Sequence, residues 1–259
     1  MKLAPPLTKP VTLQSQAVAL NYDLSVASRD GRPGDGSFDW FPNNQNASQG
    51  KALPAELLPR EIVYGGVRFS LAPTGIAKPN AVVSSGQTIT LPAGKFNRVY
   101  LLAAATGDQK ATFIVGNKQV ELTIQDWSGF IGQWDDRKWI PKEVTIPGRT
   151  PPPGTPADIA AQMQRTRTRV DAYGEMTGIT PGFIKRAPVA WFASHRHAAD
   201  GANEPYAYSY LFAYPIDLPA GAKTLTLPNN ERIRILAATV ANEPGELRPA
   251  QPLYDTLER

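Results

Sequence analysis

The amino-acid sequence predicts an all-β protein, a two-sheet antiparallel sandwich of the jelly-roll or galactose-binding kind, with a Pro-rich and short helical insertion. The 259 residues include 25 Pro and 21 Gly, which is typical of many short strands joined by turns rather than of long helices. Several segments alternate apolar and polar residues with the period of two of a strand, and one segment alone reads as a helix. The length suits one large domain with a sizeable insertion.

The strands are predicted from short patterns. Arg98–Ala105 (RVYLLAAA) is a continuous apolar run, which predicts a central strand buried on both faces. Residues 61–71 predict a hairpin around Gly65 and Gly66, and residues 111–124 predict another that turns at Gly116-Asn117. Residues 223–227 and 232–240 predict the last two strands.

The predicted organisation has a tail at residues 1–19, a sandwich over residues 20–242 and a second tail at residues 243–259. The insertion occupies about residues 141–185. It begins with a Pro-rich stretch and continues with a helix over residues 157–170, whose thin apolar stripe indicates a surface helix.

Charge and composition exclude several functions. The net charge of +4 is mild, and Arg165, Arg167 and Arg169 alternate with Thr as a solvated face would, so we expect no nucleic-acid binding. Without cysteine, disulfides, zinc thiolates and thiol nucleophiles are impossible. No apolar stretch approaches the roughly 20 residues of a membrane span. The first residues are no signal peptide, so an extracellular or periplasmic location is favoured only if a longer chain carries a signal upstream.

Residues 189–214 (VAWFASHRHAADGANEPYAYSYLFAY) hold both histidines and four of the nine tyrosines of the chain. They predict a strand, a turn near residues 200–205 and a second strand with an aromatic row. The period of two places Trp191, His195 and His197 on one face of the first strand. Because aromatic cross-strand pairs also stabilise sheets that have no function, a binding site and a core are both open interpretations.

His195 and His197 point the same way and are able to chelate one metal ion. The third ligand would come from Asp126, Asp135 or Asp200. The alternative is a pair of structural or ligand-bonding histidines.

Residues 125–139 (QDWSGFIGQWDDRKW) combine three Trp, three Asp and one Arg. Indole faces stack on sugar rings while carboxylates and guanidinium groups bond the hydroxyls, so this block predicts a sugar site; the alternative is Trp side chains that plug the ends of the sheets. Together with the histidine strand, the predicted substrate-binding residues are Asp126, Trp127, Trp134, Asp135, Arg137, Trp139, Trp191, His195 and His197.

A polar loop contains Asp30, Asp35 and Asp39 among Gly and Asn residues. Calcium takes oxygen ligands from such loops, so a structural calcium site is an open prediction, although the spacing does not match the Ca²⁺-loop consensus and Asp-Gly pairs also form ordinary turns. No cofactor is required for the predicted function.

Several motifs resemble the C-terminal β-sandwich region of bacterial glycoside hydrolase family 38 α-mannosidases. They are QTITLPAG and FNRVYLLAAA at residues 87–105, QDWSGFIGQWD at residues 125–135 and AWFASHRH at residues 190–197. Residues 38–59 also resemble sugar-binding sandwich modules attached to bacterial glycosidases. The resemblance covers roughly residues 20–242. It implies an accessory domain, because the zinc-binding and nucleophile residues of that family belong to other domains that nothing here resembles.

The function predicted from these observations is non-catalytic carbohydrate recognition, with a catalytic glycoside hydrolase domain or chain as the expected partner. One alternative is a glycoside-cleaving enzyme that uses a carboxylate pair in the same cleft. Another is a structural domain that only packs against a partner.

Overall fold

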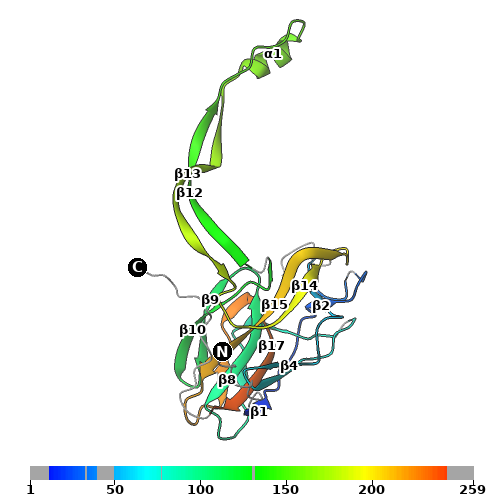
Figure 1. The fold of residues 1–259 in the computed structure, drawn as a ribbon, viewed down its shortest axis with the longest axis vertical. Helices are drawn as coiled ribbons and strands as arrows, with labels where there is room; N and C mark the ends of the chain where they lie inside the picture. Colours follow the sequence, from blue (N-terminus) through cyan, green and yellow to red (C-terminus); the bar gives the residue numbers. More distant parts are fainter. Residues whose placement is uncertain (1–11, 33, 40–49, 77, 130–131, 244–259) are drawn as a thin grey trace, which may run out of the picture. The chain divides into compact units, whose positions relative to one another are not determined.

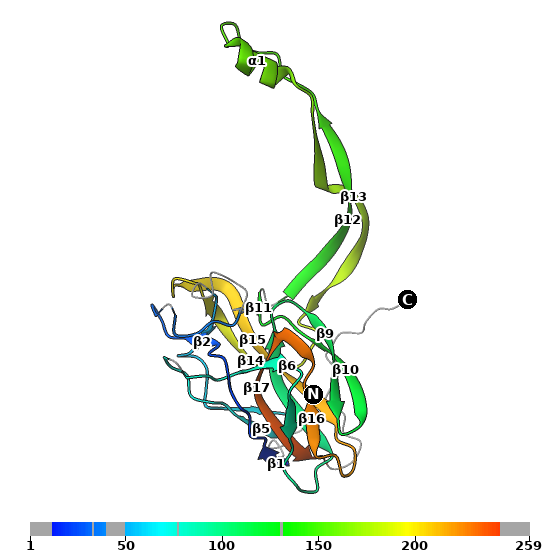
Figure 2. The ribbon, with the colours of Figure 1, turned by 180° about the vertical axis from the view of Figure 1, so that it is seen from behind.

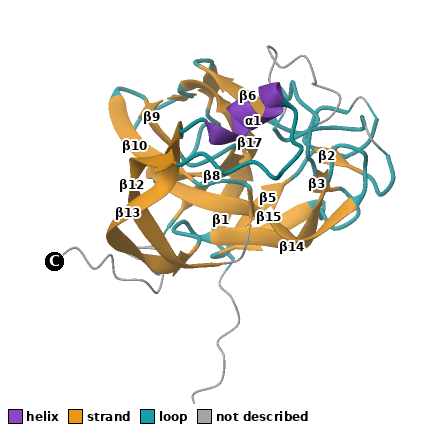
Figure 3. Cartoon of the chain, turned by 90° about the horizontal axis from the view of Figure 1, so that it is seen from above, coloured by secondary structure: helices purple, strands orange, loops and turns teal. Residues whose placement is uncertain are grey.

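The computed structural model describes residues 12–32, 34–39, 50–76, 78–129 and 132–243 (Figure 1). The chain divides into two compact units. Unit 1 comprises Met1–Ile131 and Lys185–Arg259, and unit 2 comprises Gly132–Ile184. Strands dominate both units, which confirms the predicted all-β class (Figures 2 and 3).

Unit 1 is a sandwich built on two antiparallel sheets. The larger sheet has seven strands, in the order β1-β17-β8-β15-β11, with β14 beside β15 and β6 beside β17. Its strands are β1 (Gln14–Ala17), β6 (Val82–Ser85), β8 (Arg98–Ala105), β11 (Ser128–Gly129), β14 (Val189–His197), β15 (Asn203–Asp217) and β17 (Asn229–Asn242).

The smaller sheet has four strands in the order β10-β9-β16-β7. They are β7 (Thr88–Thr90), β9 (Gln109–Val115), β10 (Lys118–Ile124) and β16 (Thr224–Thr226). Two short ribbons complete the unit: β2 (Ala27–Ser28) with β3 (Leu53–Pro54), and β4 (Glu61–Tyr64) with β5 (Val67–Ser70).

The core lies around β8, which pairs with β15 on one side and with β17 on the other. All residues of β8 after Arg98 are buried, as the apolar run predicts for a strand covered on both faces. Side chains from the smaller sheet, such as Phe113 and Leu225, belong to the same buried cluster. The two sheets therefore share one core, as in a β-sandwich.

The predicted hairpins are confirmed at their turns. Gly65 and Gly66 join β4 to β5 with φ angles of 58° and 83°. A two-residue turn with positive φ at both positions matches the twist of its strands, and glycine adopts it at little cost. Gly116, at φ 62°, lies in the turn between β9 and β10.

Unit 2 is a ribbon of two long antiparallel strands, β12 (Gly132–Ile146) and β13 (Arg167–Ile184), with the helix α1 (Ala157–Gln164) in the connection between them (Figure 1). The insertion therefore starts at residue 132, earlier than the predicted 141. The helix ends at Gln164 instead of residue 170, because from Arg167 onward Arg alternates with β-branched residues, which favours a strand.

The sequence did not predict the two long strands, because Pro and Gly within them argue against strand structure. Among the described residues, β12 pairs with β13 alone, so Pro141 lies in a strand with one unpaired edge and disrupts no sheet interior. Gly174 lies next to Lys142, and a Cβ at position 174 would stand only 2.3 Å from Lys142 Cβ. Glycine there permits the irregular register between residues 140 and 142.

Candidate metal centre

The two histidines lie on β14 as the sequence predicts. β14 pairs with β15, and the register shifts between Ala193 and His195. Ala193 is buried, whereas Phe192 and Ser194 are exposed. The side chains of His195 and His197 lie on the same face, with ring centroids 5.5 Å apart.

Two carboxylates approach this face from a short parallel ribbon. β2 and β3 run parallel with Ser28 opposite Pro54, and the Ala55 amide donates to the Ser28 carbonyl at 2.9 Å. Asp30 and Glu56 each follow the last residue of their strand by two positions. Because parallel strands end at the same edge, the two carboxylates emerge side by side.

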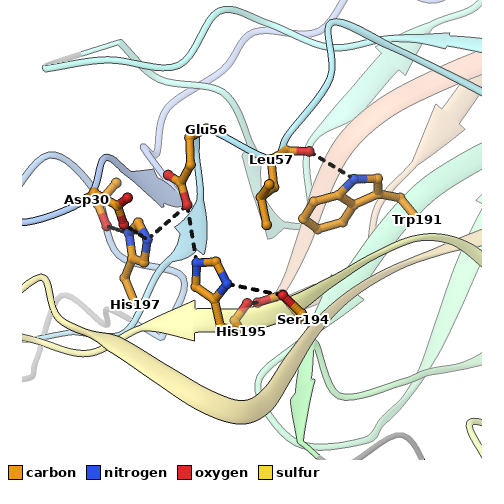
Figure 4. Close-up of polar contacts among 9 residues, drawn as sticks. Asp30, Glu56, Leu57, Trp191, Ser194, His195 and His197 are labelled. Carbon is orange, nitrogen blue, oxygen red and sulfur yellow. Dashed lines mark hydrogen bonds and ion pairs between the residues drawn. The ribbon is translucent and has the colours of Figure 1, made fainter.

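Backbone hydrogen bonds join this ribbon to the end of β14. The Ala52 amide donates to the His197 carbonyl at 3.1 Å, and the His197 amide donates to the Ala52 carbonyl at 3.0 Å. This exchange places the start of β3 beside the histidine strand. Three segments that are distant in the sequence therefore meet at one point (Figure 4).

The ligand atoms of Asp30, Glu56, His195 and His197 all lie within 4.8 Å of one another. Glu56 Oε1 lies 3.2 Å from His195 Nε2 and 3.2 Å from His197 Nε2. Asp30 Oδ1 lies 3.2 Å from His197 Nε2. One carboxylate oxygen is thus shared by two imidazole nitrogens, and a second carboxylate completes the group (Figure 4).

The cluster runs from the protein interior to the surface. The side chain of His197 is 0% exposed and that of His195 17% exposed, against 33% for Glu56 and 63% for Asp30. On the far side of the buried ring, Ser28 Oγ lies 2.9 Å from His197 Nδ1. A hydrogen bond to Nδ1 orients the ring and leaves Nε2 directed at the carboxylates.

A shallow depression of about 380 Å³ adjoins the exposed end of the cluster. It forms where two turns meet, because the Gly31 amide donates to the Gly201 carbonyl at 3.0 Å. Asp200 accepts from the amide of Ala202 and so shapes one of these turns. The residues that line the depression are Asp30, Gly31, Asp200, Gly201, Ala202 and Asn203.

The carboxylates that the structure places beside the histidine pair, Asp30 and Glu56, are not those predicted for it. Glu56 was not among the candidates, because the resemblance of residues 38–59 to sugar-binding modules assigns no role to this carboxylate. Asp30 was predicted as a calcium ligand together with Asp35 and Asp39. Those two have separate partners: Asp35 pairs with Arg29 at 2.7 Å, and Asp39 accepts from the Lys51 amide at 2.7 Å. The described residues do not bring the three carboxylates together in one cluster, so the calcium site stays a prediction.

Trp127 and Asp126 lie in unit 1 and are engaged by the protein itself. Trp127 is 3% exposed, and its ring stacks on Phe38 with centroids 4.6 Å apart, so no face is open to a sugar. Asp126 accepts from the Gly107 amide at 3.0 Å, and its backbone carbonyl accepts from Lys185 Nζ. Burial raises the pKa of the Asp126 carboxyl and lowers that of Lys185.

Trp191 is the predicted sugar-stacking residue that lies nearest to the histidines along the chain. It is partly exposed, and its indole Nε1 donates to the Leu57 carbonyl at 3.3 Å. Leu57 follows Glu56, so the indole contacts the segment that supplies the carboxylate (Figure 4).

The remaining predicted residues belong to unit 2. Trp139 makes an edge-on contact with Tyr173 at 5.7 Å between centroids. Trp134, Asp135 and Arg137 fall on β12, and their side chains lie outside the described residues. The predicted set is therefore divided between two units.

Fold and site together define a β-sandwich with a His–carboxylate cluster at the end of a strand of its larger sheet. The chain belongs to the AziU2-like beta-sandwich domain family, whose family model matches residues 14–244. The predicted sandwich is thereby confirmed, whereas the match gives no support to an association with α-mannosidases. No curated protein matches the chain. No helix in the described ranges is long and apolar enough to cross a membrane.

Proposed function

We propose that this protein binds a divalent first-row transition-metal ion, of the zinc class, through Asp30, Glu56, His195 and His197. The observation that carries the proposal is the convergence of one ligand atom from each residue within 4.8 Å. In a tetrahedral site with metal–ligand bonds of about 2.0–2.1 Å, neighbouring ligand atoms are about 3.3 Å apart. The three separations of 3.2 Å in the cluster fit that geometry.

The type of ligand narrows the choice of ion. Imidazole suits zinc and its neighbours in the first transition row, whereas calcium and magnesium prefer sites made of oxygen ligands. Two imidazoles with two carboxylates would give a neutral complex with a divalent ion, which reduces the cost of holding the charge beside a buried ring.

The gradient of exposure supports a metal that also contacts a small ligand. Zinc sites that act on substrates have three protein ligands and one exchangeable position. Asp30 is the most exposed of the four residues and borders the depression. An incoming ligand would displace Asp30 most easily, and His195, His197 and Glu56 would retain the ion.

Titration of chelator-treated protein with Zn²⁺ and Co²⁺ tests the proposal by calorimetry and by the visible absorption of Co²⁺. We expect one ion per chain and loss of binding in His195→Ala, His197→Ala and Glu56→Ala. Asp30→Ala weakens binding less. Asp200→Ala is the matched control, since Asp200 lines the depression but lies outside the cluster, and it retains full affinity. Absence of binding by the wild-type protein contradicts the proposal.

A second candidate function is carbohydrate recognition in a glycoside hydrolase system. The observation that favours it is the position of Trp191, a partly exposed indole on the same strand as His195 and beside the Glu56 segment. Glycan-array binding measured with added Zn²⁺ and with chelator tests it. Trp191→Ala should abolish binding, while Trp139→Ala in unit 2 should not. If the metal-loaded protein binds no glycan on the array, this candidate function is contradicted, and the metal proposal is unaffected.

A further inference from the structure

Unit 2 has no core of its own in the part whose side chains are described. From Lys138 to Gly178, no side chain is buried, and α1 also has no buried residue. A two-stranded ribbon alone is only marginally stable in water, because each strand leaves one edge and both faces exposed. A ribbon of this length therefore gains stability from a further strand or surface.

Exposed apolar side chains are concentrated in unit 2. Of ten large exposed hydrophobic residues among those described, six belong to it: Ile140, Ile146, Ile159, Val170, Tyr173 and Met176. Val170 and Tyr173 are 66% and 72% exposed, and both lie on β13. Unit 2 therefore leaves more large apolar side chains in contact with water than the rest of the described chain does.

The two edges of the ribbon differ in their capacity to accept another strand. β12 carries Pro141 near its middle, and proline on an edge blocks pairing because it lacks an amide proton. β13 has no proline from Arg167 to Thr180. Within the described residues, β13 pairs with β12 alone. Its other edge is thus open to an incoming strand.

The pattern of charges along β13 indicates which kind of strand would pair with this edge. At every second position β13 reads Arg167, Arg169, Asp171, Tyr173 and Glu175. The basic half is followed by an acidic and aromatic half, with Val170 at the centre. When a second β13 runs antiparallel and is centred on Val170, Arg169 of each strand falls opposite Asp171 of the other.

We propose that β13 pairs antiparallel with β13 of a second copy of this chain, centred on Val170, so that the protein forms a twofold symmetric dimer. Such an interface is isologous, and each contact occurs twice. Two exposed Val170 side chains meet at the axis, and two Arg169–Asp171 ion pairs form on the opposite face of the paired strands. The pairing is short, because the register of β13 against β12 is irregular beyond Asp171. The inference does not depend on the metal centre.

A single cysteine tests the axis directly, since the chain has none. In the proposed dimer the two Val170 Cα atoms lie about 4.5–5.5 Å apart, within the range that a disulfide bridges. We expect Val170→Cys to form a covalent dimer under mild oxidation at low protein concentration. Ile140→Cys, at another exposed position of the ribbon on β12, is the control and should stay largely uncrosslinked. Equal crosslinking of the two variants overturns the proposal.

Charge reversal tests the predicted contacts by sedimentation equilibrium of the full chain. Arg169→Asp places two pairs of like charges across the axis and should raise the dimer dissociation constant roughly tenfold or more. The double variant Arg169→Asp/Asp171→Arg restores opposite charges and should recover most of the affinity. Lys138→Glu on β12 should have no effect. A wild-type monomer at all concentrations, or a dimer insensitive to Arg169→Asp, overturns the proposal.

Discussion

Ser28 and His197 are 169 positions apart in the sequence, yet Ser28 Oγ lies 2.9 Å from His197 Nδ1. Both residues are buried. The contact fixes the orientation of the imidazole at Nδ1, while Nε2 of the same ring faces Glu56 and Asp30. It links the ribbon of β2 and β3 to β14, and the candidate metal centre depends on this link.

Ser28→Ala should therefore weaken metal binding although Ser28 is not a ligand. Loss of a group that orients a ligating histidine typically costs 10–100-fold in affinity. Co²⁺ titration of wild type and variant measures the change. Ser194→Ala is the matched control, because Ser194 is exposed and its contact with His195 Nδ1 is longer, at 3.4 Å. An equal loss in both variants would contradict a specific role for Ser28.

Metal binding should stabilise the fold, since the four ligands come from three separate segments. A ligand at 100 times its dissociation constant adds about 2.7 kcal/mol to the free energy of unfolding. Thermal unfolding followed by circular dichroism with added Zn²⁺ should show a higher Tm, which excess chelator reverses. His197→Ala should show no shift with Zn²⁺. A shift of the same size in that variant would place the bound metal elsewhere.

Two tyrosines of β15 should respond in opposite ways to loss of the hydroxyl. The Tyr214 hydroxyl accepts a hydrogen bond from the buried Gln125 amide at 2.8 Å. Tyr214→Phe leaves that donor unpaired and should cost about 1–3 kcal/mol. The buried Tyr210 hydroxyl has no hydrogen-bond partner in the described part of the chain, so Tyr210→Phe should be neutral or stabilising. Urea unfolding measures both, and an equal loss in the two variants would contradict the assignment.

Asp126→Asn should stabilise the protein more at neutral pH than at acid pH. Burial raises the pKa of Asp126 in the folded state above its unfolded value. Below about pH 4 the carboxyl is protonated in both states, and its burial costs no ionisation energy. As the pH rises from there through the folded pKa, the unfolded state ionises more readily, and the free energy of unfolding falls. Asparagine removes the penalty and retains an oxygen that can accept from the Gly107 amide. A difference between variant and wild type that is independent of pH would contradict this account.

Much of the fold follows from local patterns. Each of three predictions depends only on neighbouring residues: the apolar run of β8, the glycine-containing turns of the hairpins, and the alternation in β14 and β15. All three are confirmed. Unit 2 shows where such patterns fail. Its strands contain Pro141 and Gly174, whose local preferences oppose a strand, and cross-strand pairing outweighs them.

Part of the candidate site is also predictable from local sequence, and part of it depends on tertiary contacts. Period-two geometry on one strand is a local property, so the sequence by itself determined that His195 and His197 share a face. Their carboxylate partners depend on a parallel pairing of β2 with β3 and on a bridge from Ala52 to His197. Similarly, the apolar character of Trp127 was evident from sequence, whereas its stacking on Phe38 in the core was decided by packing. Only the tertiary structure selects Asp30 and Glu56, because contacts between distant segments have no local periodicity and arise when the whole sandwich buries its core.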